Sequence, residues 1–125
     1  MNILETSREF APEDLYKLTK DPLVEKLKDH ADEQLEVTGY CLYEDTDTKT
    51  GELRPLLALE LAEGPAVATN SPTVMRSWKD ICDIYAATST VIPYPLMIAV
   101  FTKTANSSKR DYLNIRLVQP SELAH

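Results

Sequence analysis

The fold of this chain is decided by residues 71–85, which read Ser-Pro-Thr-Val-Met-Arg-Ser-Trp-Lys-Asp-Ile-Cys-Asp-Ile-Tyr. Ser71 is a favourable N-cap, and Pro72 suits the first turn of a helix. Apolar residues then recur at the spacing of one helical face, at Val74, Trp78, Ile81, Cys82 and Tyr85. The segment therefore predicts a helix with one buried stripe, in which Trp78 is a core anchor.

Three strands are predicted before this helix. Residues 35–44 alternate with a period of two, which places Leu35, Val37, Gly39, Cys41 and Tyr43 on one face. A polar turn at residues 45–51 leads to a second strand at 52–62, and a short third strand follows at 66–69. Pro55 cannot donate a ladder hydrogen bond, so we expect it at an edge or a bulge.

Two further strands are predicted after the helix, at residues 96–103 and 110–118, joined by a polar turn. In the last strand we expect three residues to point inward (Leu113, Ile115, Leu117) and three to point outward (Tyr112, Asn114, Arg116). Before residue 35, Pro12 and Pro22 each suit the start of a short helix, with a break at Asp21.

An order of helices, three strands, one helix and two strands is that of the OB-fold, a five-stranded Greek-key barrel. The predicted fold class is therefore mainly β (α+β), with a helix between strands three and four and short N-terminal helices. An open α+β sheet with the helix on one face is the alternative. The predicted organisation is a helical extension packed on the barrel at residues 1–34, an OB-fold-like domain at 35–119 and a short tail at 120–125.

Composition excludes several functional classes. The chain has 125 residues, two cysteines and three glycines, which suits one domain in a reducing cytoplasm without a glycine-rich phosphate loop. No apolar run is long enough to cross a membrane, and no secretory signal is visible. The net charge of −7 is uneven. Residues 1–64 hold seven basic and sixteen acidic side chains (−9), and residues 65–125 hold six and four (+2).

Catalysis finds little support in the residue pattern. His30 has no partner at metal-ligand or triad spacing, and both cysteines fall in strands or helical stripes that suit a core. A metal-dependent enzyme acting on nucleic acid would need clustered carboxylates, and Glu44, Asp45 and Asp47 are the candidates for that. We therefore expect no enzyme, no metal site and no cofactor.

Binding of a single-stranded nucleic acid is better supported. Residues 101–112 combine three cations with two aromatic residues, and such binding needs charge for phosphates and aromatic faces for bases. The acidic turn at residues 44–47 would oppose a phosphate chain passing nearby. The candidate phosphate-binding residues are Lys49, Arg54, Lys103, Lys109, Arg110 and Arg116. The candidate base-stacking residues are Tyr40, Tyr43, Phe101 and Tyr112.

Four segments resemble, in matching order over nearly the whole chain, small proteins of phages and mobile elements of Gram-positive bacteria. They are residues 6–20 (TSREFAPEDLYKLTK), 40–45 (YCLYED), 68–73 (ATNSPT) and 107–112 (SSKRDY). That family is similar to OB-fold single-stranded DNA-binding proteins of replication and conjugation modules. The resemblance implies binding of single-stranded DNA in the bacterial host cytoplasm, with self-association and replication or conjugation proteins as further partners.

The charge distribution also allows a different class of function. An acidic protein-interaction module with an OB-like fold would not bind nucleic acid, and would use the acidic first half of the chain to contact a basic partner.

Overall fold

The computed structural model describes residues 1–107 and 109–119, so the predicted tail at 120–125 lies outside the described residues. The elements, in chain order, are β1 (Asn2–Thr6), α1 (Pro12–Thr19), β2 (Glu25–Lys26), the 3₁₀ turn η1 (Leu27–His30), β3 (Gln34–Thr46), β4 (Leu53–Leu61), β5 (Val67–Thr69), α2 (Pro72–Ala87), β6 (Leu96–Thr104) and β7 (Asp111–Leu117). The five strands and the helix predicted from residue 35 onward are all present.

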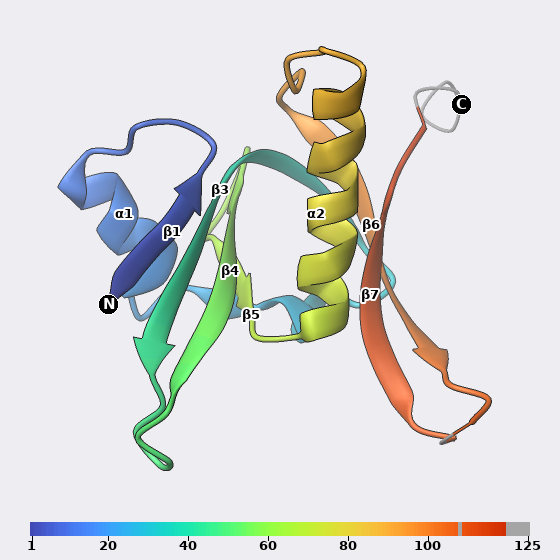
Figure 1. Ribbon diagram of the computed structural model, residues 1–125, viewed down its shortest axis with the longest axis horizontal. Coiled ribbons are helices and arrows are strands. Elements are labelled where there is room, and N and C mark those ends of the chain that lie inside the picture. Colours follow the sequence, from blue (N-terminus) through green and yellow to red (C-terminus); the bar gives the residue numbers. More distant parts are fainter. Residues whose placement is uncertain (108, 120–125) are drawn as a thin grey trace.

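The strands form one curled sheet in the order β2-β5-β4-β3-β6-β7, and β1 also pairs with β3. The mainly β, α+β class is thus confirmed, but the sheet has seven strands rather than the predicted five. The third strand of the expected barrel, β5, pairs on its outer side with β2 and on its inner side with β4. Within the described residues β7 pairs with β6 alone. The sheet is therefore a half-barrel, and α2 lies between its two arms (Figure 1).

The prediction for the first thirty residues was only partly right. Helix α1 begins at Pro12 as expected, with acidic residues in its first turn. Asp21, however, accepts a hydrogen bond from the Leu23 amide at 2.8 Å and forms a turn instead of starting a second helix. The chain then enters β2, which pairs in parallel with β5. Residues 2–6, for which helical structure was expected, form β1 against the second half of β3.

The alternation along β3 is interrupted by a bulge, because Val37 pairs with Leu61 and Gly39 with Glu60. An extra residue reverses the faces of all that follow. Leu35 and Val37 face the main core, but beyond the bulge it is Tyr40 that does so, and Cys41 faces the other side. The prediction that Leu35 to Tyr43 share one face is therefore wrong, although both faces are buried.

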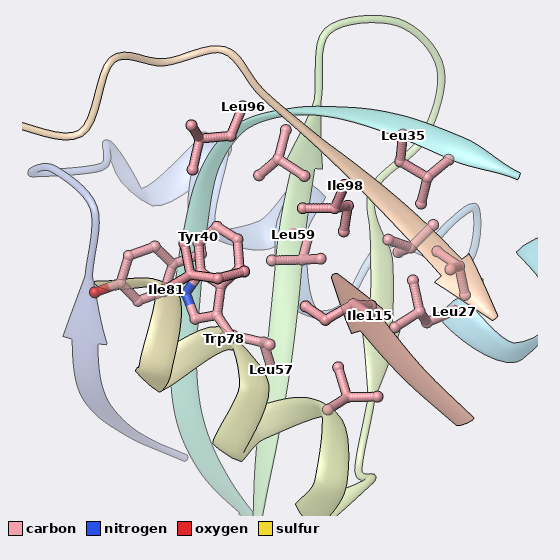
Figure 2. Close-up of a cluster of buried hydrophobic side chains, with 14 residues drawn as sticks. Leu27, Leu35, Tyr40, Leu57, Leu59, Trp78, Ile81, Leu96, Ile98 and Ile115 are labelled. Atoms are coloured by element: carbon pink, nitrogen blue, oxygen red, sulfur yellow. The ribbon is translucent and has the colours of Figure 1, made fainter. Parts of the chain in front are cut away.

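The main core lies on the concave side of the sheet, beneath α2 (Figure 2). Ser71 caps the helix by accepting a hydrogen bond from the Val74 amide at 3.2 Å. Trp78 is 3% exposed, and its ring meets Tyr40 edge to face with centroids 5.3 Å apart. The predicted helical stripe thus holds α2 in the half-barrel.

A second core lies on the opposite face of the sheet, beneath α1. It contains Leu18, Cys41, Tyr43 and Ala58, all of them buried. The residues alternate along β3 and β4 between this cluster and the main core, as the pleat requires. Both faces of the central strands are therefore covered by helices.

Candidate nucleic-acid interface

Two hairpins project from the same side of the molecule, on either side of the first turn of α2 (Figure 1). The first joins β3 to β4, and the second joins β6 to β7. The predicted phosphate-binding cations fall on both hairpins. The two hairpins differ in the side chains that surround these cations.

The β3–β4 hairpin pairs Arg54 with its own acidic residues. Arg54 Nε lies 3.4 Å from Asp47 Oδ2, and Arg54 Nη2 lies 3.8 Å from Glu52 Oε2. Backbone hydrogen bonds from Lys49 and Thr50 lower the pKa of Asp47, and the nearby Arg54 adds to this effect. Lys49 is exposed at the turn. Because this hairpin also carries Glu44 and Asp45, it stays negative and is a poor surface for phosphates.

The β6–β7 hairpin carries cations and aromatic rings on one face. Lys103 pairs with Tyr112 across the ladder, and Phe101 pairs with Asn114. Directly opposed residues in an antiparallel pair share a face, and the alternate positions Val100 and Ile115 are buried in the main core. The even-numbered residues of β7 therefore lie on the face opposite Ile115, as predicted, although Asn114 is half-buried and accepts a hydrogen bond from Ser77 Oγ of α2 at 2.6 Å.

The remaining predicted cations of this hairpin are also exposed. Lys109 has a φ of 54° in the turn, and its amide donates to the Ala105 carbonyl at 2.7 Å. Arg110 follows it, and its carbonyl closes the turn by accepting from the Ala105 amide at 2.9 Å. Among the described residues, Lys103 and Lys109 form no ion pair. Their charges are therefore available to a ligand.

Two predicted aromatic residues cannot stack on bases in this structure. Tyr40 is 6% exposed and Tyr43 is 3% exposed. Burial and a hydrogen bond to the Glu5 carboxylate raise the pKa of Tyr40, and burial raises that of Tyr43. These assignments were wrong because α1 and α2 cover the two faces of β3, which a strand pattern alone does not reveal.

Phe101 and Arg116 line a different hollow from Tyr112. They line a shallow hollow of about 400 Å³ that also includes Asp32 and Glu33. The two carboxylates make this hollow a weaker phosphate site than the tip of the hairpin.

A groove of about 690 Å³ adjoins the hairpin, between β7 and the start of α2. Tyr112 and Leu113 form one wall, and residues 69–73 form another. Lys26 and Lys28, which are not among the predicted phosphate-binding residues, also line it. The only sequence feature that marks these two lysines is the alternation of charges around Leu27. They lie beside the groove because β2 pairs in parallel with β5.

The other side chains with reactive chemistry are buried or scattered. Burial raises the pKa of Cys82 to about 11 and also raises that of Cys41, so both thiols stay protonated at neutral pH. Within residues 1–107 and 109–119, no group of three or more His, Cys, Asp or Glu side chains is placed to hold a metal ion. In the same part of the chain, no helix is both long enough and apolar enough to cross a membrane.

Comparison with protein-family models, with curated proteins and with solved structures finds no match for this chain. The family resemblance and the DNA-binding function inferred from it therefore stay predictions.

His30 fixes the segment that leads into the groove, and this contact gives a pH-dependent prediction. Its ring nitrogens lie 3.2 Å from Glu33 Oε1 and 3.0 Å from Glu25 Oε1. Burial disfavours the charged ring, but the hydrogen bonds to Glu33 and Glu25 outweigh it and raise the pKa of His30 above 6.5. A raised pKa in the folded state stabilises the protein fully below the unfolded value, and this stabilisation is lost as the pH rises through the folded value.

We therefore expect His30→Gln to lower the free energy of unfolding more at about pH 5.5 than at about pH 8.5. Urea unfolding of the wild type and the variant at both pH values measures the difference. A difference that stays constant, or that grows with pH, would show that the two carboxylates do not stabilise the charged ring.

Proposed function

We propose that this protein binds single-stranded DNA with little sequence preference and without catalysis. The observation that carries the proposal is the pairing of Lys103 with Tyr112 at the rim of a groove that Lys26 and Lys28 also line. The cations suit the phosphates of a strand, and the tyrosine offers a ring on which a base can stack. A groove between two arms of a sheet suits a flexible single strand better than a rigid duplex.

The architecture from β3 to β7 supports the same proposal. These five strands and α2 follow the order of an OB-fold, which binds its ligands on strands two and three and on the loops between strands one and two and between four and five. In this chain those loops are the two hairpins, and the acidic β3–β4 hairpin leaves the ligand to the β6–β7 side. The sequence resemblance to phage and mobile-element proteins supplies the context, which is DNA replication or transfer in a bacterial cytoplasm.

Titration of a fluorescently labelled oligothymidine with the protein, followed by anisotropy, tests this function. We expect binding at low salt that weakens as salt is added, because phosphate contacts release counterions. A duplex of the same length should bind much more weakly. Absence of binding to the single strand at low salt would contradict the proposal, and so would equal affinity for the duplex.

A further inference from the structure

A second groove lies between α1 and the turn that joins β4 to β5, next to the groove described above, with which it shares Val24 and Glu25. It has a volume of about 590 Å³, and it is called the α1 groove below. Its apolar part includes Leu18 and Leu23, the latter 72% exposed. Leu23 therefore adds an exposed apolar side chain to the edge of the groove.

The polar lining of the α1 groove is acidic. Four carboxylates line it, against the single ammonium group of Lys17. One of them, Glu60, is engaged by Arg8, whose Nη2 lies 2.8 Å from Glu60 Oε2. Glu25 Oε1 lies 3.0 Å from His30 Nε2. Asp14 forms no ion pair within the described residues, and the carboxylate of Asp21 accepts a hydrogen bond from the Leu23 amide. The groove therefore keeps uncompensated negative charge beside an apolar floor.

Lysine and arginine side chains are matched to such a surface, because their methylene stems pack on apolar groups while their charged ends pair with carboxylates. This chain carries such side chains on the β6–β7 hairpin, where Lys103 and Lys109 form no ion pair with the described residues. The hairpin and α1 lie at opposite ends of the long axis of the molecule (Figure 1). A hairpin therefore cannot reach the groove of its own chain.

We propose that the α1 groove binds the β6–β7 hairpin of a second copy of this chain, so that copies associate head to tail. The two surfaces differ, so the contact is heterologous and each pair of copies keeps one free groove and one free hairpin. Where the hairpin also binds DNA, as proposed above, the DNA and the α1 groove of another copy compete for the same lysines. The association itself needs no DNA and is measured without it, so it can hold or fail independently of DNA binding.

Sedimentation velocity over a range of protein concentrations tests the association. We expect the average mass of the wild type to rise with concentration at low salt and to fall when salt is added. The double variant Asp14→Lys, Asp21→Lys should associate at least about tenfold more weakly than the wild type, because like charges would face each other across the contact. The double variant Glu36→Lys, Asp80→Lys makes the same change in net charge outside the groove, and it should still associate.

Mixing two variants gives the sharpest result. Asp14→Lys, Asp21→Lys has a blocked groove and an intact hairpin, while Lys103→Glu, Lys109→Glu has a blocked hairpin and an intact groove. Each alone should stay monomeric, and an equimolar mixture should form dimers that grow no further. A wild type that stays monomeric at all concentrations, or groove variants that associate as well as the control, would overturn the proposal.

Discussion

Replacing Trp78 by alanine is expected to lower the free energy of unfolding by about 3–5 kcal/mol. The side chain is 3% exposed in the main core and meets Tyr40 edge to face. Alanine would remove these contacts and leave a cavity between α2 and the sheet, which the surrounding strands can close only partly. Urea unfolding followed by circular dichroism measures the change.

Two control variants make this result specific. Ile84 lies on the same helix but is 66% exposed, so Ile84→Ala should change the free energy of unfolding by no more than about 0.5 kcal/mol. The indole nitrogen of Trp78 has no hydrogen-bond partner among the described residues. Trp78→Phe therefore loses volume without losing a hydrogen bond, and it should cost less than alanine. Equal costs for Trp78→Ala and Ile84→Ala would show that α2 is not anchored in the half-barrel by this residue.

Replacing Tyr112 by alanine is expected to weaken binding of an oligothymidine by about 5- to 150-fold, because the stacking of one base on an aromatic ring is worth about 1–3 kcal/mol. Tyr112 is partly exposed, lines the groove beside α2 and pairs across the ladder with Lys103. Its removal leaves the buried residues of β7 in place, so the fold should be kept. Anisotropy titration of both proteins at one salt concentration measures the ratio of the affinities.

Tyr16 provides the matched control for this experiment. It is a tyrosine on α1, 51% exposed, and α1 lies at the end of the molecule away from the β6–β7 hairpin (Figure 1). Tyr16→Ala should bind the oligonucleotide as the wild type does. If Tyr112→Ala binds equally well, or if both variants lose the same affinity, base stacking at the groove is refuted.

The elements that could be predicted from the sequence are those specified by local signals. Helix α2 has a capping serine, a first-turn proline and a clear apolar stripe, and the β6–β7 hairpin has strict alternation around a polar turn. The two elements that were missed, β1 and β2, are short and exist because they pair with distant segments, β3 and β5. A strand of five residues, such as β1, or of two, such as β2, is too short to show the alternation that would predict such pairing.

The residues of the candidate site also fall into those that local sequence predicts and those that depend on distant contacts. Lys103 and Tyr112 could be selected from the sequence because they flank one polar turn, whereas their common face follows from the register of β6 and β7. Tyr40 and Tyr43 could not be assigned correctly, because the bulge before Gly39 changes the faces of β3 and helices from two distant segments cover both. Lys26 was not selected because its place beside the groove depends on the parallel contact of β2 with β5.

The central claim is that single-stranded DNA binds at the β6–β7 hairpin and the adjoining groove, and amide chemical shifts measured by nuclear magnetic resonance during addition of oligothymidine test it most directly. We predict that shifts concentrate in residues 101–113, 26–28 and 69–73, and that the β3–β4 hairpin changes little. Shifts confined to the β3–β4 hairpin or to α1, or no shifts at low salt, would contradict the account.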